Sequence, residues 1–293
     1  MLIPMLVLVL TINAQNLDLP IDTSIRSEHK VTVNGKSVPY SVTTGTQPVW
    51  NEAGNPVATL HFTYYRRSDI EEVEKRPLLI SFNGGPGSAS VWMHLAYTGP
   101  RILNIDEEGH PVQPYGIREN PYSILDVADI VYVNPVNTGY SRTIPLNGDS
   151  VDREQFFGIR ADIKYLAEWL NTFVSRQGRW TSPKFLIGES YGGVRVSGLA
   201  LELQEKHWMF LNGVILVSPA DYNIYISDAP ISSALSFPYF TAAAWYHKML
   251  PASLQNKDLT EILPEVEEFT VSELIPALVQ GSAISEEHRA DLA

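Results

Sequence analysis

The pattern of apolar and polar residues first predicts antiparallel strands. In HKVTVNGKSVPYSV, residues 29–42, the two classes alternate on either side of Asn34-Gly35, a dipeptide that is a strong signal for a two-residue hairpin turn. The segment NPVATLHFTYYRR, residues 55–67, alternates again, with Leu60 and Phe62 on the same face. We therefore expect an antiparallel hairpin followed by a further strand with one buried face.

The pattern then changes to short apolar runs separated by helical periodicity. Four runs, RPLLISF, ADIVYVN, FLIG and GVILVSP, are typical of strands that are buried on both faces of a parallel sheet. Between the second and third runs, apolar side chains recur every three or four positions, as in an amphipathic helix. These positions are Phe156, Ile159, Ile163, Leu166, Leu170 and Phe173. The sequence thus predicts an α/β fold with a doubly wound, mostly parallel sheet and an antiparallel N-terminal hairpin.

A third pattern, helical segments interrupted by prolines, fills residues 221–293. TAAAWYHKML ends before a proline, and TVSELIPALVQG begins with a capping box from Thr270 to Glu273. A last helix is expected to begin at Ser285. We interpret residues 15–220 as the N-terminal part of an α/β domain and residues 221–293 as an incomplete helical insertion. We expect the chain to be truncated, with the last strands of the sheet missing and an unpaired apolar edge exposed.

The first residues have the features of a secretory signal peptide, which we assign to residues 1–14. The apolar run from Leu2 to Leu10 is too short to span a bilayer, and it is followed by Ala14, a small residue suited to cleavage. The 293 residues contain no cysteine, which excludes disulfides and thiolate chemistry, and no Asn-X-Ser/Thr site. We therefore expect secretion, into a bacterial periplasm in particular, and no stable insertion into a membrane.

The charge of the chain narrows the classes of partner. Its 21 basic and 33 acidic residues give a formal net charge of −12, which argues against binding to nucleic acid or to an anionic membrane surface. A hydrophobic content of 44% is ordinary for a globular protein with a sizeable core. Neither number indicates the oligomeric state.

The segment FLIGESYGG places Ser190 between two glycines, at the junction of a predicted strand and a predicted helix. A strand–serine–helix turn this sharp needs glycine on both sides, because the backbone packs closely there. Such a turn projects the hydroxyl above the carboxyl ends of the strands, where α/β folds place their chemistry. Ser190 is therefore a candidate nucleophile, and an ordinary glycine-rich turn is the alternative.

A second glycine-rich segment, SFNGGPGSAS, follows another predicted strand at residues 81–90. A nucleophilic serine needs donors for the oxyanion that it creates, and backbone N–H groups of a tight loop are the usual source. A phosphate-binding loop is the alternative, but no lysine follows at the spacing that such a loop requires. We expect this loop to serve an oxyanion.

Three motifs in this order, NGGPGS, NPVNTGYS and GESYGG, resemble those of the serine carboxypeptidase family of α/β-hydrolases, and TAAAWYH resembles the helical lid of bacterial members. The resemblance implies release of C-terminal residues from peptides through an acyl-enzyme on Ser190. It also implies an oxyanion hole formed by the backbone N–H groups of Gly85 and Tyr191. Neither a cofactor nor a metal ion is expected.

The resemblance further implies that Asn83, Gly84 and Glu189 bind the free C-terminal carboxylate of a peptide substrate. A carboxyl group beside a substrate carboxylate assists only when it is protonated, which favours acidic pH. The family has a second glutamate before a Gly-Pro pair, and in LAYTGP that position is Tyr97. A phenol can donate a hydrogen bond but cannot share a proton as an acid pair does. An esterase or acyltransferase on the same scaffold is therefore an alternative function.

The general base is not evident in the sequence. In this fold the triad runs in the order Ser, Asp, His along the chain, which excludes the histidines before Ser190. Those histidines are His29, His61, His94 and His110. His207, His247 and His288 lie downstream, and ordinary structural roles explain each of them. Asp221 is a candidate acid. We expect the Asp and His of the triad to be absent and the chain alone to be inactive. A non-catalytic remnant that binds peptide or acyl ligands is the further alternative.

Overall fold

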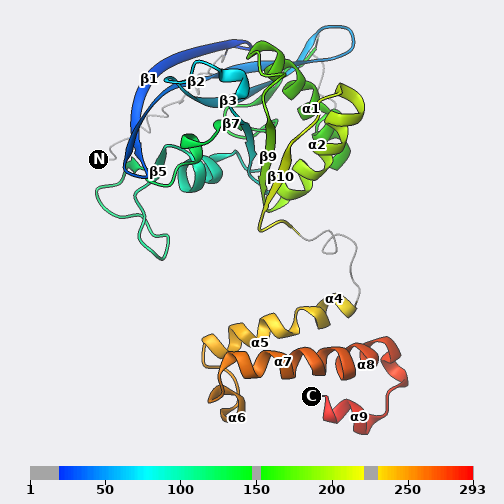
Figure 1. Cartoon of the computed structure of the whole chain (residues 1–293). Helices are drawn as coiled ribbons and strands as arrows, with labels where there is room; N and C mark the ends of the chain where they lie inside the picture. The colour runs from blue at the N-terminus through cyan, green and yellow to red at the C-terminus, as the bar shows by residue number, and fades with distance from the viewer. Residues whose placement is uncertain (1–19, 147–152, 221–229, 293) are drawn as a thin grey trace, which may run out of the picture. The chain divides into compact units, whose positions relative to one another are not determined.

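The computed structural model describes residues 20–146, 153–220 and 230–292, and it divides into two compact units at Ala220 (Figure 1). The predicted signal peptide, residues 1–14, lies outside the described residues. Each unit is described by itself. None of the helices in the described ranges combines the length and the apolar character needed to cross a bilayer.

The first unit begins with the expected hairpin. Strand β1 (Thr23–Val33) pairs antiparallel with β2 (Lys36–Trp50), and β2 pairs with β3 (Pro56–Arg67). Asn34 and Gly35 form the turn with φ angles of 49° and 74°, the left-handed conformation that a type I′ turn requires at both positions. The prediction from the Asn-Gly dipeptide is confirmed.

All four apolar runs form strands, and these strands are parallel to one another. They are β4 (Leu78–Phe82), β7 (Asp129–Val133), β9 (Lys184–Glu189) and β10 (Gly213–Val217). The strands of the main sheet lie in the order β1-β2-β3-β7-β4-β9-β10, and β8 (Arg142–Thr143) pairs with β3. A small second sheet contains β5 (Arg101–Leu103) and β6 (Ile117–Glu119). The predicted α/β architecture with an antiparallel N-terminal part is confirmed.

Two long helices pack against one face of this sheet. They are α1 (Ile159–Arg176) and α2 (Tyr191–His207). The expected helical stripe is correct from Ile159 onward, but the helix does not include Phe156, because Gly158 precedes it with a non-helical φ of 121°. Short helical segments in the connections are η1 (Val73–Lys75), η2 (Met93–Thr98), η3 (Ile124–Asp126) and η4 (Arg153–Gln155).

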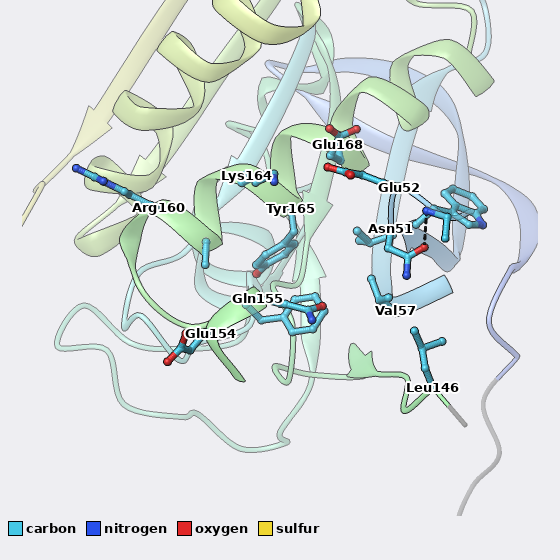
Figure 2. A pocket seen from close by; sticks show the side chains of 15 residues that line it. Asn51, Glu52, Val57, Leu146, Glu154, Gln155, Arg160, Lys164, Tyr165 and Glu168 are labelled. Carbon is cyan, nitrogen blue, oxygen red and sulfur yellow. Dashed lines mark hydrogen bonds between the residues drawn. The ribbon is translucent and has the colours of Figure 1, made fainter. Parts of the chain in front are cut away.

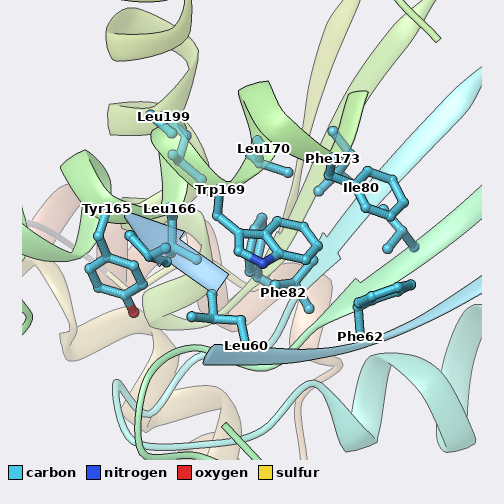
Figure 3. Packing of buried hydrophobic residues seen from close by; sticks show 14 of the residues in the cluster. Leu60, Phe62, Ile80, Phe82, Tyr165, Leu166, Trp169, Leu170, Phe173 and Leu199 are labelled. Atoms are coloured by element: carbon cyan, nitrogen blue, oxygen red, sulfur yellow. The ribbon is translucent and has the colours of Figure 1, made fainter. Parts of the chain in front are cut away.

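The main core lies between these helices and the sheet (Figure 3). Trp169 and Phe173 of α1 are fully buried, and their rings stack at 5.1 Å between centroids. Phe62 of β3 packs against both rings. Burial of aromatic side chains of this size stabilises the unit by about 2 kcal/mol or more for each side chain.

Strand β10 differs from the other three parallel strands. It is the last strand in the sheet order, and Val214, Ile215 and Leu216 are 38%, 39% and 49% exposed. The prediction that this run is buried on both faces is therefore wrong in the described part of the chain. Among the described residues β10 pairs with β9 alone, so it forms an apolar edge of the sheet, while the expected truncation stays a prediction.

The second unit is helical, and in it α5 packs on α7 and α4 on α8. Its helical segments are α4 (Pro230–Leu235), α5 (Phe237–Tyr246), α6 (Ala252–Gln255), α7 (Leu259–Phe269), η5 (Thr270–Leu274), α8 (Ile275–Gln280), η6 (Gly281–Ala283) and α9 (Glu286–Asp291). The prediction of a capping box at Thr270 is wrong, because Thr270 has helical φ and ψ angles and its hydroxyl donates to the Val266 carbonyl. Ser285 does cap α9, by accepting a hydrogen bond from the His288 N–H.

A buried ionic cluster lies where the parallel strands begin. Asp129, the first residue of β7, is fully buried and accepts hydrogen bonds from Arg76 Nε and Arg179 Nη1, each at 2.7 Å. Arg179 Nη1 also donates to the Tyr64 hydroxyl at 2.5 Å. One carboxylate thus compensates two guanidinium groups that are almost completely removed from water.

We expect Asp129→Asn to lower the free energy of unfolding by about 3 kcal/mol or more, because two buried cations would lose their counter-charge. The matched control is Asp22→Asn, whose partner Arg176 and whose own side chain are both exposed. That substitution is expected to cost about 1 kcal/mol or less. Urea denaturation measures both values. Equal losses in the two variants would contradict this account of the cluster.

Candidate active site

Ser190 lies in a sharp turn between β9 and α2, as the sequence predicts. Its φ of 56° is in the left-handed region, which side chains other than glycine adopt only at a cost in free energy. A methyl group on Gly188 would overlap the carbonyl oxygen of Gly192, so space requires glycine before Ser190, whereas a methyl group on Gly192 would make only a tight contact of 3.0 Å with the Phe82 carbonyl oxygen. The strained backbone is thus imposed by the close packing of the strand end against the first turn of the helix.

Hydrogen bonds fix both peptide groups of Ser190. Its N–H donates to Val217 of β10 at 3.0 Å. Its carbonyl accepts from the N–H groups of Gly193 at 2.9 Å and of Ala220 at 3.0 Å. In a trans peptide the N–H points away from the carbonyl. The N–H of Tyr191 therefore points away from these two donors.

The glycine loop lies directly against this turn. A methyl group on Gly84 would lie 2.6 Å from the Tyr191 nitrogen and 2.8 Å from the Ser190 Cβ. No side chain fits at that position, and only glycine allows the two backbones to approach so closely. The structure therefore brings together the two glycine-rich motifs that the sequence analysis selected.

The N–H of Gly85, the second candidate oxyanion donor, belongs to a peptide group whose orientation is fixed by a hydrogen bond. The carbonyl of Gly84, on the other side of that peptide, accepts a hydrogen bond from the Ser88 N–H at 3.3 Å. Gly85 itself has a φ of 111°, a conformation that favours glycine. The loop is thus tied back on itself by its own backbone.

Asn83 and Glu189 lie side by side at the ends of β4 and β9. Asn83 is 1% exposed, and its Nδ2 donates to Glu189 Oε2 at 3.0 Å. The N–H of Gly84 lies 3.4 Å from the same carboxylate oxygen. Asn83 Oδ1 accepts from the Met93 N–H at 3.0 Å, which fixes the orientation of the amide. All three residues that were expected to bind a carboxylate are therefore adjacent.

The NPVNTGYS motif supports the glycine loop from the neighbouring strand. Asn134 Oδ1 accepts from the Ser90 N–H at 3.0 Å, and the Ser90 hydroxyl donates to the Val133 carbonyl at 2.5 Å. The motif carries the family resemblance, but these contacts were not predicted from it. The position of Asn134, directly after a buried strand, was the signal in the sequence that could have indicated its contact with the loop.

Tyr97 lies on η2, the helical segment that follows the glycine loop. Its side chain is exposed, and its carbonyl accepts a hydrogen bond from Asn120 Nδ2 at 2.9 Å. Within the described residues, no hydrogen bond joins the Tyr97 hydroxyl to Glu189. The position of the family's second glutamate is therefore occupied by a free-standing phenol at the surface.

No histidine in the described ranges donates to or accepts from the Ser190 hydroxyl. His207 ends α2, a helix of 17 residues, which puts it roughly 24 Å along the helix from Ser190, and it lies 3.8 Å from Glu168. His247 and His288 belong to the second unit. Asp221 lies outside the described residues.

A surface hollow and an acidic cluster were also found, and neither contains a predicted site residue. A hollow of about 870 Å³ lies between the β2–β3 turn and the start of α1, and none of the predicted site residues lines it (Figure 2). Asp106, Glu108 and His110 lie within 4.8 Å of one another on the exposed turn between β5 and β6. Exposed acidic turns of this kind are common without a metal ion, and we assign no site to this one.

A half-buried histidine follows the glycine loop. The ring of His94 stacks on Tyr132 at 4.4 Å between centroids, and its Nε2 lies 2.6 Å from the Tyr65 hydroxyl. Burial and, to a smaller extent, the nearby His61 together lower the pKa of His94 to about 4. The neutral ring therefore belongs to the packing beneath the loop.

The comparison with protein families decides the class of this chain. A family model described as serine carboxypeptidase matches residues 47–270. The chain belongs to the serine carboxypeptidase family. The match includes the glycine loop, the NPVNTGYS motif and the turn at Ser190. The resemblance found from the three motifs is confirmed, while the expected kinship with bacterial members stays a prediction.

Curated relatives in plants and fungi agree with this family. Serine carboxypeptidase-like 13 of Arabidopsis thaliana is 30% identical over 200 residues, which are 67% of this chain and 43% of the relative. Serine carboxypeptidase-like 36 of the same plant is 29% identical over 57% of this chain and 33% of the relative. A carboxypeptidase Y homolog of Arthroderma benhamiae is 26% identical over 73% and 42%. The chain spans less than half of the length of each of these relatives.

A solved structure supports the fold. Kex1ΔP, a prohormone-processing carboxypeptidase from Saccharomyces cerevisiae, aligns with a TM-score of 0.54 at 20% identity, over 79% of this chain and 48% of that chain. Together with the family match, this likeness confirms the predicted α/β-hydrolase fold.

The lowered pKa of the half-buried His94 makes stability depend on pH in a defined window. The unfolded chain takes up a proton near pH 6.5, whereas the folded chain resists protonation down to about pH 4. Stability is therefore lost as the pH falls from 6.5 to 4, by at most about 3 kcal/mol from this group. We expect His94→Gln to remove this part of the loss, as measured by urea denaturation at pH 7 and pH 4.5.

The control for that experiment is His110→Gln, at an exposed position. The account is wrong if wild type, His94→Gln and His110→Gln all lose the same stability between the two pH values.

Proposed function

We propose that this chain contains the nucleophile, the oxyanion donors and the carboxylate-binding residues of a serine carboxypeptidase that works through an acyl-enzyme. The observation that supports this most directly is the contact between the glycine loop and the Ser190 turn, where Gly84 abuts the Tyr191 N–H. The family match gives the class of protein. The reaction of the whole protein is our inference.

In the proposed acylation, Ser190 Oγ attacks the carbonyl carbon of the last peptide bond. The carbonyl π bond opens, and its electron pair forms an oxyanion that the N–H groups of Gly85 and Tyr191 stabilise. When the carbonyl re-forms, the C–N bond breaks and the leaving amine takes the proton that the base removed from the serine. Water then attacks the ester by the same route, and Ser190 recovers its proton.

Substrate selection is proposed to reside in Asn83 and Glu189. The Asn83 amide lies 3.0 Å from the Glu189 carboxylate, at the edge of the sheet where Ser190 is displayed. An amide N–H and a protonated carboxyl are both donors to the free carboxylate of a peptide. A single charge-assisted hydrogen bond of this kind contributes about 1.5–3 kcal/mol, enough to favour peptides with a free C-terminus.

We further propose that none of the seven histidines of this chain is the base. His61 is engaged with Asn134 and Thr44, and His94 with Tyr65. His207 is at the far end of α2. The 293-residue chain by itself is therefore proposed to be a poor hydrolase. An extracellular or lumenal location is proposed from the apolar run at residues 2–10.

An esterase or acyltransferase is the second candidate function, and Tyr97 favours it. The phenol stands where the family has an acid, it is 54% exposed, and no described hydrogen bond fixes its hydroxyl. Loss of the acid pair weakens recognition of a free carboxylate more than it weakens the acyl-transfer chemistry at Ser190. Relative rates on matched substrates separate the two functions.

We expect the protein expressed from its complete coding sequence to hydrolyse an N-blocked dipeptide with kcat/KM roughly tenfold or more above that for its C-terminal amide. The reason is that only the free acid can accept hydrogen bonds from both Asn83 and a protonated Glu189. Ser190→Ala should lower the rate by roughly 1,000-fold or more. Ser197→Ala, on the same helix with its hydroxyl bonded to the Gly193 carbonyl, is the control.

Equal kcat/KM for the acid and the amide, with a higher value for the corresponding ester, would replace the carboxypeptidase by the esterase. Hydrolysis that survives in Ser190→Ala would exclude Ser190 as the nucleophile and reject the proposal altogether.

A further inference from the structure

Arg195 is a charged residue in the buried part of α2 that the proposed reaction does not use. It lies five positions after Ser190, in the otherwise apolar or small segment YGGVRVSGLAL, and it is 1% exposed. Burial of a guanidinium group is unfavourable unless hydrogen bonds and a counter-charge compensate it. The position of these partners indicates what the residue does.

The guanidinium group binds in two directions at once. On one side, Nε donates to Asp162 Oδ2 of α1 at 2.7 Å. On the other side, Nη1 donates to the carbonyl of Asn83 at 2.7 Å, and Nη2 lies 3.5 Å from the carbonyl of Pro86. Arg195 thus connects the helix that begins at the nucleophile with both ends of the segment Asn83–Pro86.

The counter-charge is itself fixed in place. Asp162 is buried, and its Oδ1 accepts from the Tyr165 hydroxyl at 2.9 Å. That hydroxyl accepts in turn from the Val136 N–H at 3.1 Å. Because every member of the chain has a partner, the Arg195 fork is directed rather than free to rotate.

The bond to Asn83 sets the direction of a peptide group in the site. The Asn83–Gly84 peptide is trans, so its N–H points opposite to the carbonyl that Arg195 binds. On that opposite side the Gly84 N–H lies 3.4 Å from Glu189 Oε2. The fork therefore fixes which way the first peptide of the glycine loop faces, from behind the loop.

We propose that Arg195 is a positioning residue for the reaction proposed above, on which this inference rests. By binding the Asn83 carbonyl while Asp162 anchors it, Arg195 keeps the Asn83–Gly84–Gly85 backbone against the Ser190 turn. Substrate and oxyanion then meet donors that need no rearrangement. Lysine cannot replace it, because an ammonium group is a point donor without the planar fork.

A merely structural role is the competing explanation, and the chain contains a matched control for it. Arg179 is also 1% exposed and is also paired with a buried aspartate, Asp129. It lies where the parallel strands begin, whereas Ser190 lies at their carboxyl ends. Arg195→Lys and Arg179→Lys therefore remove the same chemistry from two equally buried sites, only one of which touches the loop.

The experiment compares both variants in the protein expressed from its complete coding sequence, at a temperature where both are folded. For the N-blocked dipeptide we expect Arg195→Lys to lower kcat by roughly 30-fold or more, in line with the loss of an ordered oxyanion donor. For Arg179→Lys we expect kcat within roughly threefold of wild type, because its loss acts on stability alone.

Amide hydrogen exchange in residues 83–92 supplies a readout that does not need activity. Arg195→Lys should accelerate exchange there by roughly tenfold or more, because the loop opens locally when its anchor is lost. Arg179→Lys should change it only as far as global unfolding changes. If Arg195→Lys does not fold, Asp162→Asn, which leaves Arg195 in place but neutralises its anchor, is expected to shift both readouts in the same direction.

Equal effects of the two lysine variants on kcat and on loop exchange would overturn the proposal and leave Arg195 as a structural residue. A wild-type protein without hydrolytic activity would instead reject the proposed function, and the exchange comparison would still decide whether Arg195 orders the loop.

Discussion

A close approach of two backbones organises the site: Gly84 and the Ser190 turn meet at a distance that leaves no room for a side chain. A methyl group on Gly84 would lie 2.6 Å from the Tyr191 nitrogen. The approach depends on β4 and β9 being adjacent and parallel, with Phe82 paired to Gly188. Asn83 and Glu189, the next residues on each strand, must therefore lie side by side.

Buried charges lie at both ends of the parallel strands, with the apolar core between them. At the end where the parallel strands begin, Asp129 compensates Arg76 and Arg179. At the end of the strands that carries Ser190, Asp162 compensates Arg195. Such clusters are costly to bury, and their value is directional, because each fixes main-chain carbonyls that a hydrophobic side chain could not bind. At the second end those carbonyls belong to the glycine loop.

The local features of the fold could be predicted from the residues themselves, whereas the meeting of the glycine loop with the Ser190 turn was expected only from the family resemblance, and the other contacts between distant segments could not be predicted. Asn34-Gly35, the apolar runs and the glycines around Ser190 each express their structure within a few residues. The Arg195–Asp162 pair joins residues that are 33 positions apart, and no local pattern announces it. The exposure of β10 depends on which strands neighbour it. Thr270 failed as a cap because the helix before it continues, which a four-residue signature cannot reveal.

The central claim is that the close contact at Gly84 forms the reactive site, and the rate of covalent labelling of Ser190 by a fluorophosphonate tests it most directly. The protein from the complete coding sequence is compared with Gly84→Ala and with Gly87→Ala, whose added methyl group would meet no atom within 4 Å. We expect a rate constant lower by roughly 100-fold or more in Gly84→Ala, because displacement of the loop removes a proposed oxyanion donor, and one within roughly threefold of wild type in Gly87→Ala. A folded Gly84→Ala that is labelled as fast as wild type would contradict this claim.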